Sequence, residues 1–289
     1  MGCGALMFSW LSGPGDRIVF ERPYYLRELS GLGGAPVDIR EQRSTGQDGA
    51  TPLEQQLLPR DIIVELMVVG PDPGYLRRRR RDLAWALNPK LGTGTLTWER
   101  DGQGFEVRAV PEESPTFIDS LETGSRAVRA IIHLRASDPF WYTAEMVSPL
   151  LTLEGGLNFP MVLCTEFAER SPGSTAVIDN PGDVPAPVVL RFWGPATAPI
   201  TISNETTDEH VQVVTDLSPD EVLVVDTNPG RKSIVVESEE GETGAMHYVS
   251  LDTVFWHFET GENTIVFDTG GVGEVAEAEI RWRPRYVGV

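Results

Sequence analysis

The second half of the chain is a succession of short strand-like runs, which turn-forming residues interrupt at near-regular intervals. The runs begin about 12 residues apart, a spacing typical of strands in all-β sandwiches. The turns carry Asn, Pro, Gly or Asp and lie at residues 180–183, 194–195, 218–220, 228–230 and 261–263. Apolar and polar residues alternate in VQVV and AEIRWR, so at least one sheet face is expected to contact water. The pattern predicts an antiparallel β-sandwich or jelly roll and requires no helix.

The first half is also rich in strand-like runs, but it contains one helix signal. Strands are predicted at residues 5–10, 17–20, 36–40, 60–69, 94–99, 103–110 and 126–135. A helix is predicted within residues 71–92, because the segment opens with Pro and Gly and closes with Asn88-Pro89 and Gly92. The polar segment 41–59, which contains Gly and Pro, is predicted to be a long loop or a hairpin arm.

Five consecutive arginines lie inside the predicted helix. Leu76, Leu83 and Leu87 form one narrow apolar stripe along it, which is expected to face a core. Consecutive helix residues are about 100° apart, so the arginines surround most of the helix and cannot all point to one solvent-facing side. Some of them should therefore reach acidic groups on this chain or on a neighbouring copy. We expect contacts between subunits at Arg77, Arg78, Arg80 and Arg81.

The charge balance of the chain changes near residue 145. Residues 1–145 carry 17 Lys and Arg against 20 Asp and Glu, whereas residues 146–289 carry 7 against 23. A chain of 289 residues is longer than most single domains, so we predict two domains, 1–145 and 146–289. The formal net charge of -19 argues against a nucleic-acid-binding protein, because phosphate recognition needs a clustered positive field.

The residue types that carry catalysis or bind metals show no productive spacing. Cys3 and Cys164 are too few for a disulfide framework, and assembly in a reducing cytoplasm is expected. No acidic residue is placed for a zinc site beside the histidines, which are His133, His210, His247 and His257. No nucleophile elbow or phosphate-binding loop occurs. We therefore expect no catalytic residue, no cofactor site and no metal site, although the acidic residues within 237–242 are compatible with bound calcium.

No segment predicts export or a membrane span. The opening MGCGALMFSWL lacks the basic start of a signal peptide, and its alternating Leu6, Phe8 and Trp10 favour a first strand. No apolar run reaches the roughly 18 residues that a membrane helix needs.

Six segments, in order along the chain, together resemble the distal tail protein (Dit) family of siphoviruses, the long-tailed phages. They are LRRRRRDLAWALNPKLGTGTLTWERDGQGFEVRAV (76–110), ASDPFWY (136–142), VIDNPGDVPAPVVLRFWGPATAPITISNETT (177–207), EVLVVDTNPG (221–230), GENTIVF (261–267) and EIRWRPRYVGV (279–289). Residues 1–75 resemble the family only through their strand pattern.

The resemblance implies a mainly β fold, with an N-terminal β-sandwich or split barrel that has one α-helix and a C-terminal galectin-like or jelly-roll β-sandwich. It implies a structural protein of the virion tail tip, six copies of which form a ring that continues the DNA channel. The implied partners are other copies of the chain, the tail tube protein, the tail hub protein and the tape measure protein. The second domain is implied to hold a receptor-binding protein or to contact host surface glycan, and DNA would pass without specific binding.

Two rival functions stay open on the residues alone. A carbohydrate-binding β-sandwich adhesion protein would stack sugars on tryptophans, and Trp193, Trp256 and Trp282 fit either this platform or, more often, a sandwich core. A glycan depolymerase would need two carboxylates that face each other across a cleft. Glycan binding by residues 146–289 would favour the first rival, and release of reducing sugars would favour the second. A gene position between the tape-measure and hub genes would favour the distal tail protein.

Overall fold

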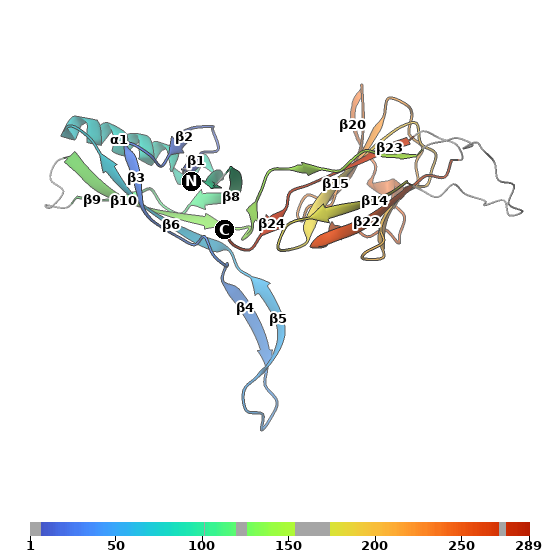
Figure 1. Cartoon of the computed structure of the whole chain (residues 1–289), viewed down its shortest axis with the longest axis horizontal. Helices are drawn as coiled ribbons and strands as arrows, with labels where there is room; N and C mark the ends of the chain where they lie inside the picture. Colours follow the sequence, from blue (N-terminus) through green and yellow to red (C-terminus); the bar gives the residue numbers. More distant parts are fainter. Residues whose placement is uncertain (1–6, 101, 120–125, 154–173, 272–275) are drawn as a thin grey trace, which may run out of the picture. The chain divides into compact units, whose positions relative to one another are not determined.

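The structure is a computed structural model that describes residues 7–100, 102–119, 126–153, 174–271 and 276–289. The chain divides into two compact units, Met1–Ala144 with Tyr286–Val289, and Glu145–Arg285 (Figure 1). The last four residues were expected in the second domain, but they pack in the first unit. The described residues are mainly in strands and contain one α-helix, which confirms the predicted fold class. Cys3 and Cys164 lie outside the described residues, as does a strand-like run of the second half at residues 158–163.

Unit 1 is an antiparallel sheet with a helix and a separate hairpin. Its elements are β1 (Met7–Leu11), β2 (Arg17–Val19), β3 (Tyr24–Ser30), β4 (Val37–Gln42), β5 (Thr51–Leu57), β6 (Arg60–Val69), α1 (Pro73–Ala86), η1 (Pro89–Leu91), β7 (Gly94–Arg100), β8 (Gln103–Pro111), β9 (Thr116–Ile118), β10 (Ala127–Ala136), β11 (Trp141–Tyr142) and the returning β24 (Arg285–Tyr286). The sheet order is β2-β1-β7-β8-β10-β6-β3, and β4 pairs only with β5.

The centre of unit 1 is the long pair β6 and β10. Their register runs unbroken from Ala127 opposite Val69 to Ala136 opposite Arg60. Alternate residues of β6 point inward, and Ile62, Val64 and Leu66 are fully buried. A strand alternates its side chains between the two sheet faces, so the sequence RDIIVELMVV places one apolar row in the core.

Helix α1 lies within the segment 71–92 in which a helix was predicted. The side chain of Asp72 caps the helix by accepting from the Tyr75 backbone N–H at 2.8 Å, and Pro occupies the first turn. Pro89 lies two residues beyond Leu87, where it prevents the helix from continuing. The apolar stripe is buried as predicted, since Leu76, Leu83 and Leu87 are at most 6% exposed.

Strands β3, β9, β11 and β24 were not predicted from the sequence. Strand β3 has an edge position and pairs only with β6, so most of its side chains contact water and its alternation is weak. Strand β5 lies in the polar segment 41–59, for which a long loop or a hairpin arm was predicted, and it forms a hairpin arm with β4. Strands β3 and β5 are polar because one or both of their faces are exposed.

Arg60, the first residue of β6, is buried at the point where three chain segments meet in unit 1. Its Nε donates to the Pro139 carbonyl at 2.8 Å, and Nη1 donates to the carbonyls of Gly31 and Gly33. Nη2 donates to the Val287 carbonyl. The side chain is 1% exposed, and no carboxylate among the described residues pairs with it. Burial lowers the pKa of the guanidinium from its ordinary value, but arginine stays charged at neutral pH.

Unit 2 is a sandwich of two antiparallel sheets. Its elements are β12 (Met146–Val147), β13 (Leu151–Leu153), β14 (Ser174–Asn180), β15 (Ala186–Trp193), β16 (Ile200–Asn204), β17 (Glu209–Val213), β18 (Val222–Asp226), β19 (Ser233–Ser238), β20 (Gly241–Gly244), η3 (Met246–Tyr248), β21 (His257–Phe258), β22 (Gly261–Asp268) and β23 (Ala276–Trp282). One sheet has the order β12-β23-β15-β18-β19-β20 and the other β14-β22-β16-β17.

The core of unit 2 lies between these two sheets. Phe192 of β15 contacts Phe267 of β22 with ring centroids 5.5 Å apart, which joins the sheets. Phe258 packs edge-on against Trp282 at 5.0 Å. Such aromatic pairs stabilise a core beyond the area that they bury. The unit therefore has a hydrophobic core of its own.

We predict that Arg60→Ala lowers the free energy of unfolding by at least about 3 kcal/mol, because four backbone carbonyls lose their donor and a buried side chain is removed. Arg60→Lys should have an intermediate effect, because one ammonium cannot reach all of these carbonyls. Arg77→Ala, at an exposed arginine, is the control and should change the free energy by less than about 0.5 kcal/mol. Urea unfolding measures all three. An Arg60→Ala effect as small as that of the control would contradict the role assigned to Arg60.

We also predict that residues 145–285 fold alone, because their core is internal to the unit. Residues 1–144 alone should be less stable than the same fragment joined through a short Gly-rich linker to residues 286–289. The added residues supply the Val287 carbonyl and the Tyr286 ring, which packs on Phe105 at 5.3 Å. Thermal unfolding followed by circular dichroism compares the fragments. Equal melting temperatures for the two versions of unit 1 would mean that the returning residues contribute nothing.

Candidate functional site

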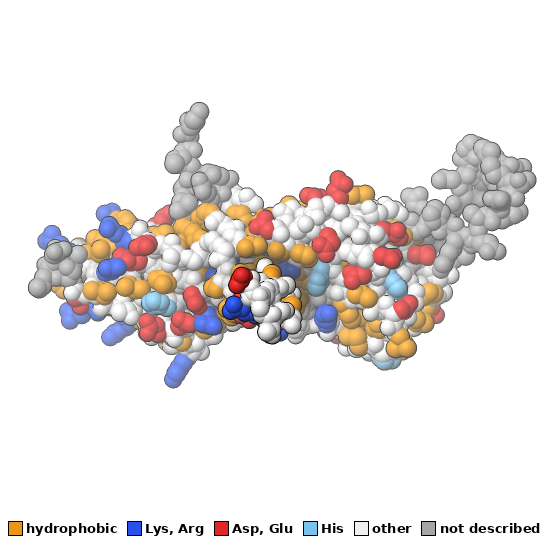
Figure 2. Space-filling model, turned by 90° about the horizontal axis from the view of Figure 1, so that it is seen from below, with side chains coloured by type: hydrophobic (Ala, Val, Ile, Leu, Met, Phe, Trp, Pro, Cys, Tyr) orange, Lys and Arg blue, Asp and Glu red, His pale blue; other side chains and the backbone are white. Residues whose placement is uncertain are grey.

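The most highly charged element of unit 1 is α1, with its five consecutive arginines. Lys and Arg side chains gather over unit 1 in Figure 2, while acidic side chains are spread over unit 2. Arg79 pairs with Asp82 at 3.0 Å, and Arg80 pairs with Asp119 at 3.3 Å. The Arg80 guanidinium also lies over the Phe117 ring at 4.7 Å. Two of the five arginines therefore meet acidic groups of their own chain.

The other three arginines of α1 point outward. Arg77, Arg78 and Arg81 are exposed, and none forms an ion pair with another residue in the described part of the chain. The contacts expected at Arg77, Arg78, Arg80 and Arg81 are contacts between copies, and a single chain does not test them. They stay a prediction, with Arg80 already engaged by Asp119.

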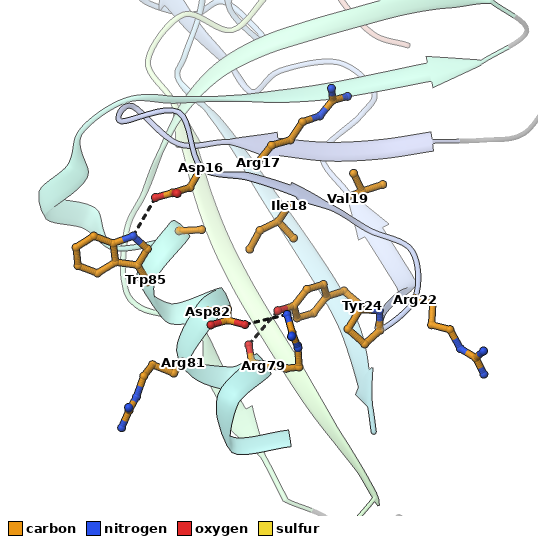
Figure 3. Close-up of a pocket in the computed structure, with 12 residues that line it drawn as sticks. Asp16, Arg17, Ile18, Val19, Arg22, Tyr24, Arg79, Arg81, Asp82 and Trp85 are labelled. Carbon is orange, nitrogen blue, oxygen red and sulfur yellow. Dashed lines mark hydrogen bonds and ion pairs between the residues drawn. The ribbon is translucent and has the colours of Figure 1, made fainter. Parts of the chain in front are cut away.

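A groove with a volume of about 590 Å³ lies between α1 and β2, and we call it the α1–β2 groove (Figure 3). Its apolar part is formed by Ile18, Val19, Pro23, Tyr24, Trp85 and Ala86. Trp85 is 58% exposed, although tryptophan usually buries most of its surface. The groove was not predicted from the sequence, because it forms between elements that are distant along the chain.

Charged side chains surround this apolar part. They are Asp16, Arg17, Arg22, Arg79, Arg81 and Asp82. Both acids are engaged, since Asp16 accepts from the Trp85 indole N–H at 2.9 Å and Asp82 pairs with Arg79. In Figure 3 the side chains of Arg17, Arg22 and Arg81 extend outward around the groove. The rim is therefore net cationic and suits an apolar surface with acidic neighbours.

Tyr24 joins the groove to the helix backbone. Its hydroxyl donates to the Arg79 carbonyl at 3.1 Å. Burial, with a contribution from the charge of Asp82, raises the pKa of this hydroxyl from its ordinary value. Tyr24 thus stays protonated at neutral pH, and it fixes one wall of the groove.

The β4–β5 hairpin is the second unusual surface of unit 1. In β4 every residue is exposed, and Val37, Ile39 and Leu53 expose 46%, 50% and 63% of their surface. The register places Val37 opposite Leu57 and Ile39 opposite Gln55, so these residues share one face. An isolated two-stranded hairpin is marginally stable in water, and an apolar face of this kind marks an interaction surface.

Unit 2 does not bring its three tryptophans together as one sugar-binding platform. Trp256 and Trp282 are 1% and 4% exposed and belong to the core, as the sequence favoured. Trp193 is half-buried outside that core, with Arg191 5.8 Å from its ring centroid. Arg191 in turn pairs with Glu237 at 2.7 Å.

The described residues contain no group of three or more His, Cys, Asp or Glu side chains arranged to hold a metal ion. The closest ion pair of a histidine with an acid there joins His210 to Asp252 at 3.4 Å. No helix in the same ranges is both long and apolar enough to cross a membrane.

Polar residues of the segments that resemble the distal tail family are buried in unit 2. Asn180, Asn204, Thr227 and Asn263 are at most 1% exposed. Thr227 Oγ1 accepts from the Val188 N–H at 2.9 Å and donates to the Val188 carbonyl at 3.0 Å. These side chains satisfy backbone groups at turns and between strands, so their role is structural.

Asn263 has the most complete set of these bonds. Its Nδ2 donates to the carbonyls of Glu259 and Gly261, each at 2.9 Å. Its Oδ1 accepts from the Glu259 N–H at 2.9 Å and from Asn204 Nδ2 at 3.2 Å. The turn that leads into β22 is thus held by a single buried amide.

Comparisons with known proteins agree with this architecture. The family model described as siphovirus-type tail component, C-terminal domain, matches residues 181–286. No curated protein matches the sequence. The Dit protein (gp 19.1) of phage SPP1 is similar in structure over 96% of this chain and 98% of its own, with 13% identity and a TM-score of 0.70. That protein is described as a paradigm of the hub adsorption apparatus in phages that infect Gram-positive bacteria.

Chains of the phage p2 baseplate in its activated conformation are also similar. The form with Sr matches over 99% of this chain and 100% of its own, with 10% identity and a TM-score of 0.53. The form with Ca has the same coverage and identity and a TM-score of 0.52. The resemblance to the distal tail protein family is thereby confirmed as a similarity: residues 181–286 match the model of the tail-component domain, and the described residues share the fold of the SPP1 Dit protein.

We predict that Asn263→Ala lowers the free energy of unfolding of unit 2 by about 2–4 kcal/mol, because four hydrogen bonds, one buried and three part-buried, are lost at once. Glu262→Ala, at the exposed preceding residue of the same strand, should stay within about 0.5 kcal/mol of the parent. Tryptophan fluorescence in urea follows unfolding, since Trp256 and Trp282 lie in this core. Similar effects of the two substitutions would show that the amide network does not hold the turn.

Proposed function

We propose that this protein is a structural component of a siphovirus tail, the distal tail protein at the hub of the tail tip. The observation that carries the proposal is the match of residues 181–286 to the siphovirus tail-component domain, within a chain that shares the Dit fold over 96% of its length. The chain works through its surfaces in the assembled virion, and we assign it no catalytic residue and no cofactor.

In this proposal, six copies of the protein form a ring that joins the tail tube to the host-adsorption apparatus and continues the DNA channel. The β4–β5 hairpin supports self-association, because its apolar face has no partner in its own unit. Closed cyclic rings are a common solution when each copy carries two different complementary surfaces. The ring would assemble in the host cytoplasm and take its place in the virion.

The neighbours in this proposal are the tail tube protein, the tail hub protein and the tape measure protein. Unit 2 would hold a receptor-binding protein or contact a glycan of the host surface. DNA would pass through the ring without being held. Of the three tryptophans that the rival carbohydrate-binding function would use, only Trp193 lies outside the core of unit 2, because Trp256 and Trp282 are buried in it.

We predict that the purified protein forms rings of six copies, and that reversing two exposed charges, Arg78→Glu with Arg81→Glu, lowers the yield of rings. The reversal places acids where α1 would contact a neighbouring copy, while the fold of each copy should persist because both side chains are exposed. Multi-angle light scattering gives the mass, and class averages from electron microscopy give the symmetry.

Arg231→Glu with Lys232→Glu is the matched control, because it makes the same change of charge at exposed residues of unit 2. The control should form rings as the parent does. A parent protein that stays monomeric at every concentration and in intact tails would refute the ring. A normal ring yield from the α1 variant would refute only the arginine contact.

A further inference from the structure

We propose that the α1–β2 groove binds an extended peptide segment of a partner protein, which pairs with the free edge of β2 and carries an apolar side chain between two carboxylates. The proposed function names the neighbours of the ring but gives this groove no occupant, so the inference goes beyond it. Three observations carry it: the open edge of β2, the exposed Trp85 across from that strand, and the arginines of the rim.

The sheet of unit 1 is open at β2, because this strand pairs only with β1. Two bonds flank the strand: the Phe20 N–H donates to the Phe8 carbonyl at 2.8 Å, and the Ser12 N–H donates to the Asp16 carbonyl at 2.9 Å. Asp16 and Phe20 thus direct backbone groups toward β1. Every second residue of an antiparallel strand does so, and Ile18 is therefore the next residue whose backbone faces β1.

The backbone groups of Arg17 and Val19 consequently face away from β1. Their two N–H donors and two carbonyl acceptors lie on the free edge, where no strand of the described residues pairs with them. Such an edge is a template for a further strand. A segment laid along β2 would make up to four main-chain hydrogen bonds over about 10 Å, from three residues at roughly 3.4 Å each.

Helix α1 forms the other wall of the groove and supplies an apolar surface for side chains of the segment. Trp85 is 58% exposed there, and its indole is fixed by the bond to Asp16 at 2.9 Å. The volume of about 590 Å³ lies within the roughly 300–1,000 Å³ of specific binding sites. It suits a few side chains of an extended segment better than the surface of a folded domain. In strand addition, main-chain bonds give affinity and such side-chain pockets give specificity.

The charge of the groove determines which residues should flank the apolar side chain. Four arginines and two aspartates line it, a net charge of +2, and both aspartates already have partners in this chain. Arg17 and Arg22 are exposed, and neither forms an ion pair within the part of the chain that the structure describes. Arg17 begins β2 and Arg22 follows its end, so a carboxylate at each end of the segment gains a charge-assisted contact. The same arginines disfavour a basic segment.

A partner peptide fits these features better than an anionic polymer does. A phosphorylated or sulfated polymer would use the arginines, but it would leave the Trp85 surface and the open donors and acceptors of β2 without partners. Apolar surface gains by leaving water, and only a segment with an apolar side chain and a main chain can cover both.

Selection from a display library of random peptides tests the chemistry of the occupant. The purified full chain is the target, and peptides that also bind the Trp85→Ala variant are removed. The recovered peptides should share an apolar residue with Asp or Glu on both sides. A synthetic, fluorescently labelled copy of the strongest binder then serves as the probe in fluorescence polarisation.

Trp85→Ala and Arg22→Glu should each weaken binding of this probe at least tenfold, because the first removes the apolar wall and the second reverses a rim charge. Arg27→Glu and Trp193→Ala are the matched controls, since both residues lie outside the groove, and each should change the affinity less than twofold. Circular dichroism verifies that all four variants keep the fold of the parent.

Methylation of the peptide's own amides tests strand addition. Successive amides of a strand point in opposite directions, so methylation of every second amide should weaken binding at least tenfold, and methylation of the amides between them should have little effect. The amides of Arg17 and Val19 should also exchange hydrogen more slowly when the peptide is bound. Equal effects of methylation at all positions would contradict pairing with β2.

The remaining outcomes separate this inference from its rivals. A library that yields no binder dependent on Trp85, or yields basic binders, overturns it. Binding that is lost with Arg22→Glu, survives Trp85→Ala and is displaced by polyphosphate assigns the groove to an anionic polymer instead. Binding to single chains but not to assembled rings assigns the groove to a second copy and also overturns the inference. A parent protein that forms no rings but binds the peptide refutes the ring and leaves this inference standing.

Discussion

A buried guanidinium needs partners for its N–H groups, because an unpaired charge in a protein interior is costly. Arg60 finds them in backbone carbonyls that lie 27 to 227 positions away along the chain. The loop after β3, the segment that leaves for unit 2 and the segment that returns must therefore converge before this charge is stable. Unit 2 is thus a long insertion between two anchored points of unit 1, and the fold of unit 1 is complete only when the end of the chain has returned.

The parts of the fold that local rules govern could be predicted from the sequence. Strands such as β6 show clear alternation, and α1 has both its cap at Asp72 and its stop at Pro89. Strand β3 could not be predicted, because an edge strand with exposed faces carries no apolar row. The bonds of Arg60 could not be predicted either, since nothing near residue 60 indicates a partner at Val287.

The candidate site also has parts that could be predicted from the sequence and parts that could not. Helix geometry predicts that some arginines of α1 meet acidic groups. The pair Arg79–Asp82 is such a contact, and its two residues are only three positions apart in the helix. The pair Arg80–Asp119 spans 39 residues, and it depends on where the chain brings Asp119. The groove depends on the packing of β2 against α1, and the exposure of Trp85 results from that packing. Sequence could identify the charged helix but not the apolar surface beside it.

The Dit protein of phage SPP1 shares this fold at 13% identity, which fits what a β-sandwich demands of its sequence. Core positions accept exchange among apolar residues of similar volume, so the strands can diverge widely. Buried amides such as Asn263 and hydroxyls such as Thr227 have specific bonds to satisfy, and the segments that resemble the family contain these residues. Surface residues need neither fill a core volume nor satisfy specific buried hydrogen bonds. The shared fold therefore sets the framework of the chain, while exposed side chains such as Trp85 and the outward-facing arginines of α1 are not set by it.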